Sequence, residues 1–440
     1  MKIINSGEFD AYWQRNKKKP DDKKTDKTVK KIIADVQAKG DAAVKKYAAK
    51  FDKSSPEQLE VPFAAAKKEL EKLRADNPQL VEALEYAAQN IKRFSEKQKE
   101  QFVNFEYEME KGLVTGQRVI PVQRAAVYIP GGRFPLFSSA LMCMIPAFCA
   151  GVKEVILASP PMEDGIPDRK TLAAAAIAAS VCGIKSQRLR FFAIGGAQAI
   201  AALSFGTDSI PKVDIIAGPG SRFVAAAKRI LFGEVGIDFI AGPSDVLVIS
   251  EPQDEKSAGF AAADMIAQAE HDPDARARAL VPDREYAGKI AAAIEERLVK
   301  LPTEKTARAS LKAGGLIIVY KSKEEAVRIA NIIAPEHLEL QTADDDSWIP
   351  LLENYASLFI GALCPEALGD YSAGVNHTLP TETGARFTGG LSVRNFLKTV
   401  TTLRCTESGG YEKARNAAEI IGRAEGLEGH AQSAACRKKI

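Results

Sequence analysis

Residues 124–160 read RAAVYIPGGRFPLFSSALMCMIPAFCAGVKEVILASP. Two short, nearly continuous apolar runs, each ending in proline, flank a longer helical stretch. This order is typical of a strand, a helix and a second strand in a parallel sheet covered on both faces. The alternation continues to residue 233, and a second series runs from DVLVIS at 245–250 to SLFIGA at 357–362. We therefore predict an α/β protein with two tandem units, roughly 125–235 and 236–378.

The segments on either side of these units have a different character. Between residues 28 and 101, apolar side chains recur at spacings of three and four, which predicts helices. We expect residues 1–124 to form a helical region that packs on the α/β core. Residues 379–440 are predicted to be loop and helix. This tail is too short to bury a core alone, so it should dock on another surface, with a partner subunit as one candidate.

Composition argues against several classes of function. The 440 residues carry 60 basic and 57 acidic side chains, so no global field attracts nucleic acid or an anionic membrane. The lysine-rich stretch 17–31 is interleaved with aspartates, which favours a solvated linker over a nucleic-acid-binding arm. No apolar run approaches the ~20 residues that cross a bilayer, and no secretory signal is visible. The six cysteines lack a CxxC pair and indicate buried thiols in a reducing compartment. We expect a cytoplasmic protein that binds neither nucleic acid nor membrane.

Three glycine-containing loops follow predicted strands: YIPGG at 128–132, IGGAQ at 194–198 and AGPGS at 217–221. None is the GxGxxG fingerprint of a dinucleotide site. In an open α/β sheet such loops line the ligand crevice, where helix N-termini favour phosphate. From spacing alone, phosphate contact and a plain strand-to-helix turn both stay open.

A second group of residues could bind a metal ion. Gln268 and His271 lie three residues apart near the end of a predicted helix, so both side chains can face the same way. Asp370 and His377 flank a loop, and His430 lies near the end of the final helix. Two imidazoles and a carboxylate suit zinc, although glutamine is an unusual ligand and HExxH spacing is absent. Isolated surface or core histidines are the alternative interpretation.

The segment APEHLEL at 334–340 offers an acid–base pair. Glu336 and His337 follow a proline that ends a predicted helix, at the lip of the sheet. Histidine titrates near neutrality, so an imidazole beside a carboxylate can transfer protons. A capped turn with an exposed glutamate explains the same residues, and a motif this short does not decide between them.

The chain resembles the histidinol dehydrogenase family along nearly its whole length. The resemblance is carried, in the family's order and spacing, by VYIPGG, GGAQAIAALSFGT, VDIIAGPG, AGPSDVLV, QAEHDPD, APEHLEL, GDYSAGVNHTLPT and AEGLEGH. It implies a zinc- and NAD-dependent enzyme that oxidises L-histidinol to L-histidine through L-histidinal, using two NAD, in histidine biosynthesis. It also implies two incomplete Rossmann-like domains and a homodimer with swapped C-terminal tails.

The resemblance also implies roles for individual residues. The implied zinc ligands, which would also contact the substrate, are Gln268, His271, Asp370 and His430. His337 would contact the substrate and accept the alcohol proton, and Glu336 would activate water for the second oxidation. The other implied contacts are Ser244, His377 and Glu425 for the substrate, and Tyr128, Gln198 and Ser221 for NAD. Glu425 and His430 would reach the neighbouring subunit's site.

Departures from the family pattern gather around the cofactor. Ser221 stands where GPGN is usual, Phe134 where a small residue is usual, and Phe148 where a basic residue is common, so the choice between NAD and NADP stays open. Three alternatives are a dehydrogenase on the same scaffold for another primary alcohol, such as a sulfonated diol, a zinc hydrolase, and a non-catalytic binding protein. Glu425 and His377 suit the cationic amine and imidazole of histidinol, and they favour histidinol over another primary alcohol as the substrate.

Overall fold

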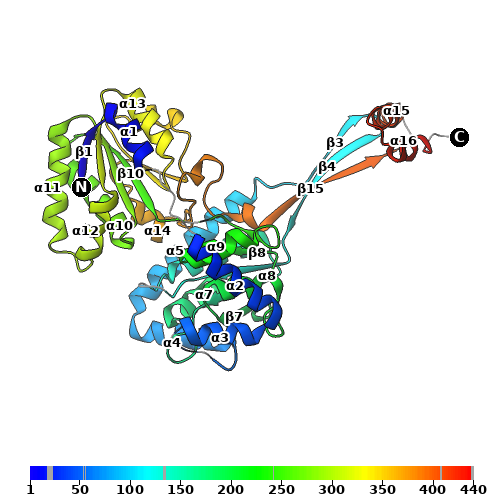
Figure 1. Cartoon of the computed structure of the whole chain (residues 1–440), viewed down its shortest axis with the longest axis horizontal. Helices are drawn as coiled ribbons and strands as arrows, with labels where there is room; N and C mark the ends of the chain where they lie inside the picture. Colours follow the sequence, from blue (N-terminus) through cyan, green and yellow to red (C-terminus); the bar gives the residue numbers. More distant parts are fainter. Residues whose placement is uncertain are drawn as a thin grey trace.

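The computed structural model describes residues 1–16, 23–52, 54, 56–131, 135–240, 242–406 and 409–437. This part of the chain forms two α/β lobes and a long β-arm that carries the last two helices away from both lobes (Figure 1). Each lobe contains a six-stranded sheet. The predicted α/β architecture with parallel sheets is confirmed.

The first lobe has the strand order β2-β7-β6-β5-β8-β9, parallel except for β2, which runs antiparallel to β7. Its strands are β2 (Glu60–Val61), β5 (Arg124–Tyr128), β6 (Glu154–Ser159), β7 (Leu189–Ala193), β8 (Ile215–Ala217) and β9 (Gly236–Ile237). Along β5, Ala125 and Val127 pack into one hydrophobic cluster, and Ala126 and Tyr128 pack into another. Both faces of the sheet are therefore covered, which explains the continuous apolar runs in the sequence.

Helices from two parts of the chain cover the two faces of this sheet. One cluster contains side chains of α4 (Phe63–Asp76), α5 (Pro78–Lys99), α6 (Ser138–Ala150) and α7 (Arg169–Val181). The other contains side chains of α2 (Lys23–Lys39), α3 (Asp41–Phe51), α8 (Gly196–Phe205) and α9 (Arg222–Leu231). The early helices α2 to α5 thus complete the core of the first lobe.

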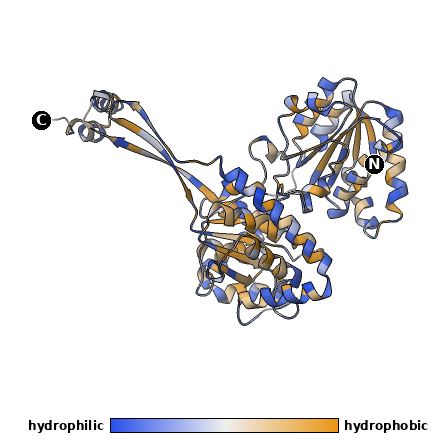
Figure 2. Cartoon of the chain, turned by 180° about the vertical axis from the view of Figure 1, so that it is seen from behind, coloured by the Kyte–Doolittle hydropathy of each residue, from blue (hydrophilic) through white to orange (hydrophobic). Residues whose placement is uncertain are grey.

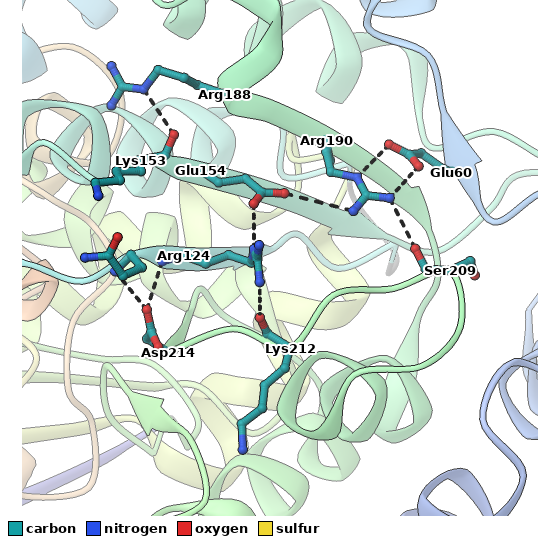
Figure 3. A network of polar contacts seen from close by, with 10 residues as sticks. Glu60, Arg124, Lys153, Glu154, Arg188, Arg190, Ser209, Lys212 and Asp214 are labelled. Atoms are coloured by element: carbon teal, nitrogen blue, oxygen red, sulfur yellow. Dashed lines mark hydrogen bonds and ion pairs between the residues drawn. The ribbon is translucent and has the colours of Figure 1, made fainter.

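Ion pairs join the strands of the first sheet near their amino ends (Figure 3). Arg124, which begins β5, pairs with Glu154, which begins β6, at 2.6 Å. Arg190 on β7 pairs with Glu60 on β2, also at 2.6 Å. These contacts lie at the edge opposite the strand carboxyl ends.

The second lobe is fully parallel, with the order β1-β12-β11-β10-β13-β14. Its strands are β1 (Lys2–Asn5), β10 (Asp245–Ser250), β11 (Arg276–Val281), β12 (Leu316–Val319), β13 (His337–Gln341) and β14 (Ser357–Ile360). One cluster contains side chains of α10 (Ser257–His271), α11 (Arg284–Leu298) and α12 (Glu304–Gly314). The opposite cluster contains α1 (Ser6–Asn16) and α13 (Lys323–Ile333), while the short α14 (Glu366–Tyr371) follows β14.

The arm is a three-stranded antiparallel sheet with the order β15-β4-β3. It consists of β3 (Phe105–Glu110), β4 (Leu113–Pro121) and β15 (Leu397–Cys405). At its tip, α15 (Gly409–Ala424) and α16 (Glu428–Ala435) pack against each other. Hydrophobic residues occur along the arm among polar ones (Figure 2), and Phe105, Tyr107 and Leu403 are exposed.

The structure differs from the expected helical region 1–124 and from the expected loop-and-helix tail. The segment before residue 125 also contains four strands. Of these, β1 joins the sheet of the second lobe, where α1 also packs, whereas α2 to α5 pack on the first lobe. These strands are short or lie in the exposed arm, so they lack the apolar pattern of buried strands. The lysine-rich stretch 17–31 was expected to be a linker, but from Lys23 onward it belongs to helix α2. Residues 17–22 lie outside the described part. No helix of the described chain is long and apolar enough to cross a membrane.

Candidate active site

Residues from both lobes line one cavity of about 650 Å³. The first lobe contributes the loops that follow β5 and β8, at the carboxyl ends of its strands. The second lobe contributes residues at the amino ends of its strands, namely Ser244 just before β10 and His337 at the start of β13. It also contributes the C-terminal end of α10. One wall therefore presents helix N-termini and the other presents the C-terminal end of α10.

The second-lobe wall brings together most of the predicted metal and acid–base residues. The Nε2 atom of His271 lies 4.0 Å from Oδ2 of Asp370, whose Oδ1 lies 3.5 Å from Nε2 of His337. The Nδ1 atom of His337 lies 3.2 Å from Oε1 of Gln268. Gln268 and His337 are buried, and His271 is partly exposed to the cavity. Four side chains from α10, β13 and α14 thus meet at one point.

Buried polar atoms at this point lack partners. Within the described residues, Nε2 of Gln268, Nε2 of His337 and Oε2 of Glu366 have no hydrogen bond. An unpaired buried polar atom is costly, and such atoms gather where a site expects a ligand. Rotating the Gln268 amide by 180° would turn its oxygen from His337 to the unpaired position. A cation bound there by the amide oxygen of Gln268, the imidazole of His271 and the carboxylate of Asp370 would give the turned Gln268 amide a partner. The donor set therefore fits a zinc ion that still lacks a ligand.

The remaining predicted ligand is elsewhere. His430 on α16 and Glu425 just after α15 are exposed at the tip of the arm, far from this chain's own cavity (Figure 1). In the described chain, no group of three His, Cys, Asp or Glu side chains is placed to hold a metal ion. The candidate metal centre within one chain consists of Gln268, His271 and Asp370.

The residues of the predicted acid–base pair, Glu336 and His337, are buried at and just before the start of β13 and line the cavity. Burial raises the pKa of Glu336 to about 7, and the nearby Asp245 carboxylate adds to the increase. Burial alone would lower the pKa of His337, but the carboxylates of Glu336, Glu366 and Asp370 outweigh it and hold that pKa well above its usual value. The predicted exposed glutamate of a capped turn is therefore not what the structure contains, because Glu336 is only 4% exposed.

His377 connects the two walls. Its Nδ1 atom lies 2.8 Å from the carbonyl oxygen of Asp370, and its Nε2 atom lies 2.9 Å from Oγ of Ser139 at the start of α6. Burial lowers the pKa of His377, which favours the neutral ring. Ser244 lines the same cavity. Both residues are therefore within the cavity where the resemblance expects substrate contacts.

The predicted cofactor residues separate into two groups. Ser221 occupies the N-cap position of α9, without a capping hydrogen bond from its side chain, and lines the cavity. Tyr128 and Gln198 are buried: the Tyr128 hydroxyl accepts a hydrogen bond from the Gly196 N–H at 3.0 Å, and the Gln198 amide donates to Asp52 at 3.4 Å. They support the loops that follow β5 and β7.

Phe148 and Phe134 are two of the three departures from the family pattern. Phe148 is buried in the core of the first lobe, so the interpretation of this residue as part of the cofactor surroundings is wrong. Its side chain points into packing with apolar neighbours, where a large apolar group is stable. Phe134 lies outside the described residues.

Sequence reasoning missed three side chains near the site: Ser139, Asp245 and Glu366. Ser139 contacts His377, and Glu366 has its Oε2 atom 3.6 Å from Nδ1 of His337. A signal for Glu366 was present, because residues 366 and 370 share one face of a helix. Asp245 lies in AGPSDVLV, where it was not distinguished from the strand it begins.

These features describe a two-lobed α/β protein with a buried glutamate and histidine, Glu336 and His337, on one wall of its cleft, an arrangement typical of an enzyme. A family model for histidinol dehydrogenase matches residues 15–438. The chain belongs to the histidinol dehydrogenase family, which is a family of oxidoreductases.

Similar proteins agree over almost the whole length. Histidinol dehydrogenase of Aquifex aeolicus is 42% identical over 415 residues, which cover 94% of this chain and 92% of the relative. The Thermus thermophilus histidinol dehydrogenase is 42% identical over 419 residues, covering 95% of each. The crystal structure of histidinol dehydrogenase from Elizabethkingia anophelis matches with a TM-score of 0.88 at 32% identity, covering 99% of this chain and 97% of that one.

Proposed function

We propose that this protein oxidises L-histidinol to L-histidine through L-histidinal, with two NAD, as part of histidine biosynthesis. The observation that carries the proposal is the meeting of Gln268, His271 and Asp370 beside His337 on one cavity wall. The relatives' names agree with this substrate. A substrate with an imidazole and an amine next to a primary alcohol suits a wall rich in acidic and imidazole groups.

The orientation of the helices supports opposite charge preferences on the two walls. The second-lobe wall lies at the C-terminal end of α10, where the helix dipole favours cations. The first-lobe wall lies at the N-termini of α6 and α9, where backbone N–H groups favour anions such as phosphate. We infer that the cationic substrate and the zinc ion bind on the wall of the second lobe. NAD would bind on the wall of the first lobe, near Ser221, Tyr128 and Gln198.

Zinc would be held by Gln268, His271 and Asp370, with His430 from a second copy of the chain as the fourth ligand. When bound, zinc would supply positive charge that holds the substrate nitrogens and lowers the pKa of His337, and NAD would take up the hydride. His377 and Ser244 would contact the substrate from within the cavity, and Glu425 of the second copy would face its amine.

His337 and Glu336 would divide the proton transfers. In the first oxidation, the imidazole of His337 accepts the proton of the substrate hydroxyl. In the second, Glu336 accepts a proton from the water that adds to the aldehyde. Its raised pKa makes this carboxylate a stronger base than an exposed glutamate, which suits the task near neutral pH.

The arm supports a homodimer in which each tail completes the neighbour's site. It projects away from both lobes and leaves apolar residues exposed, among them Leu403 and Ile420, each 67% exposed. Exposed apolar surface of this kind marks an interaction site. A second copy is the natural occupant, because the site lacks a ligand that the tail carries.

A substrate panel tests the proposal against its closest alternative. The purified protein should form NADH with L-histidinol, and sulfonated diols and simple primary alcohols should be at least about 100-fold poorer in kcat/KM. Equal or better turnover of a sulfonated diol would favour the other dehydrogenase. Hydrolysis without any change in nicotinamide absorbance would favour a zinc hydrolase. The same panel with NADP would settle the choice of cofactor.

A further inference from the structure

A chain of polar contacts runs backward from Glu336 into the second lobe. The Asp245 N–H donates to Oε2 of Glu336 at 3.0 Å, and the Glu336 N–H donates to Oδ1 of Asp245 at 3.2 Å. Arg278 on β11 then donates from Nη1 to Oδ2 of Asp245 at 2.9 Å. All three side chains are buried. Glu336 is thus tied to a buried ion pair.

Arg278 is itself held on a second side. Its guanidinium lies over the ring of Trp13, 5.4 Å from the ring centroid, and Trp13 stacks on the fully buried Phe9 at 5.5 Å. A planar guanidinium fits both a carboxylate and an aromatic face, which an ammonium group does less well. Helix α1 therefore helps to hold Arg278 in place, and Arg278 in turn contacts Asp245, which contacts Glu336 at the cavity wall.

The ion pair is outside the cavity that holds Glu336. Asp245, Arg278 and Trp13 line a separate cavity of about 210 Å³, whereas Glu336 lines the larger one with the candidate metal residues. Asp245 and Arg278 do not line the larger cavity, and their hydrogen bonds reach its wall at Glu336.

The charge of Arg278 matters because Asp245 and Glu336 are two acids held close together, each carboxylate accepting a hydrogen bond from the other residue's backbone N–H. Like charges repel, and without the guanidinium this repulsion would push the two carboxylates apart. The guanidinium of Arg278 offsets the repulsion and holds the Asp245 carboxylate in place. The Asp245 N–H then fixes Oε2 of Glu336, and the Oε1 atom is left for water.

We propose that Arg278 and Asp245 are positioning residues that hold Glu336 in the orientation needed to activate water for the second oxidation. This inference rests on the proposed function and deepens it. In that step the water oxygen bonds to the aldehyde carbon while Glu336 takes one water proton. The hydrate then loses a hydride to NAD and a further proton. In total, one alcohol, two NAD⁺ and one water give one carboxylate, two NADH and three protons.

The proposal predicts a selective defect. Arg278→Met should slow oxidation of the aldehyde about tenfold or more, because a displaced general base loses much of its effect. Conversion of the alcohol to the aldehyde, which does not use Glu336, should change by about twofold at most. Free histidinal should then accumulate, and the NADH formed per histidinol should fall from two toward one. Arg278→Lys, which keeps the charge without the planar fork, should lie between wild type and Arg278→Met.

The experiment supplies the full-length protein with histidinol and, separately, with histidinal. It measures NADH, traps free aldehyde with semicarbazide for mass spectrometry, and records zinc content and melting temperature. Arg190→Met is the matched control. Like Arg278, Arg190 pairs with a carboxylate, that of Glu60 (Figure 3), and its guanidinium lies over an aromatic ring, that of Phe192, 5.0 Å from the ring centroid. It should lower the melting temperature and leave the ratio of the two oxidation rates unchanged.

Two results would overturn the inference: Arg278→Met with an unchanged ratio of the two rates, or a shift of that ratio in Arg190→Met as well. If Arg278→Met does not fold, Arg278→Lys and Trp13→Leu decide by the same ratio, with Trp13→Leu expected to shift it in the same direction by a smaller factor. A wild-type protein that forms no NADH from histidinol would instead refute the proposed function itself.

Discussion

The His337 ring has groups on both sides that determine its orientation. Nδ1 faces the Gln268 amide and the Glu366 carboxylate, and Nε2 faces Asp370. The sequence alone identified His337 and Glu336 as a possible pair but could not show that they are buried. Burial depends on β13 running between β10 and β14, which places the pair inside the molecule.

Replacement of His337 tests its role as the base. His337→Ala should lower kcat for histidinol oxidation by about 10²- to 10⁴-fold, because the hydroxyl proton loses its acceptor. Zinc content should stay near that of the wild type, since the ligands are other residues. Steady-state NADH formation and elemental analysis measure the two effects. Activity within twofold of wild type would rule out this role.

Asp52 offers a test of pH dependence away from the proton-transfer pair. Burial raises the pKa of Asp52 to about 6, against a weaker opposing effect of the Gln198 hydrogen bond. The folded protein therefore binds this proton more tightly than the unfolded chain does. The resulting stabilisation is complete below about pH 4 and is lost as the pH rises through about 6.

The variant Asp52→Asn stays neutral at every pH and should gain stability relative to the wild type over that range. We expect its melting temperature to exceed that of the wild type by about 1–3 °C at pH 8, with a smaller or no excess at pH 4. The exposed Asp76→Asn is the control. If the melting temperatures of Asp52→Asn and the wild type differ by the same amount from pH 4 to pH 8, the pKa of Asp52 is not raised.

At the scale of elements, most buried strands and helices were predictable, whereas buried β13 and the exposed strands of the arm were not. The runs that became β5, β6 and β10 are continuous and apolar because helices cover both faces of their sheets. β15 reads LKTVTTLRC and has mainly exposed residues, so no burial pattern marks it. The segment that forms β13 was interpreted only as a motif, because Glu339 interrupts its apolar run.

The turn after β8 is an element with a strict backbone requirement. Gly218 has φ +114°, and a Cβ atom there would collide with the carbonyl oxygen of Tyr128. Its N–H donates to Asp238 at 2.8 Å, and Asp238 forms a buried ion pair with Lys228 of α9. The turn thus fixes the loop that leads to Ser221.

Gly218→Ala should therefore destabilise the protein by about 2 kcal/mol or more and weaken NAD binding. Gly233→Ala separates the steric clash from the backbone strain, because Gly233 has φ +105° and no atom within 4 Å of the added Cβ. Denaturant unfolding and NAD titration measure the two effects. Equal losses in both variants would show that the contact with Tyr128 does not matter.

At the scale of the whole molecule, the proposed metal site needs two chains. One chain brings together Gln268, His271 and Asp370, while His430 lies at the tip of an arm that points away. Sequence reasoning placed His430 among the ligands only through the family resemblance. No local pattern could have shown that a paired β15 and β4 carry this residue out of the lobes.

Mixing two inactive variants tests the shared site. His271→Ala and His430→Ala should each be inactive alone, but refolding them together should recover about 25% of wild-type activity, because half of the dimers are mixed and each has one intact site. In a mixture of His271→Ala and Asp370→Ala, every chain lacks one of the ligands in its second lobe. This mixture should therefore recover no activity. No recovery in the first mixture would contradict the exchange of tails.

The most direct test of the whole account is the amount of NADH formed per molecule of histidinol consumed, measured with and without a chelator. The account predicts two NADH per histidinol, loss of activity when the metal is removed, and its return when zinc is added. One NADH per histidinol with free aldehyde as the end product, or full activity after complete removal of metal, would contradict it.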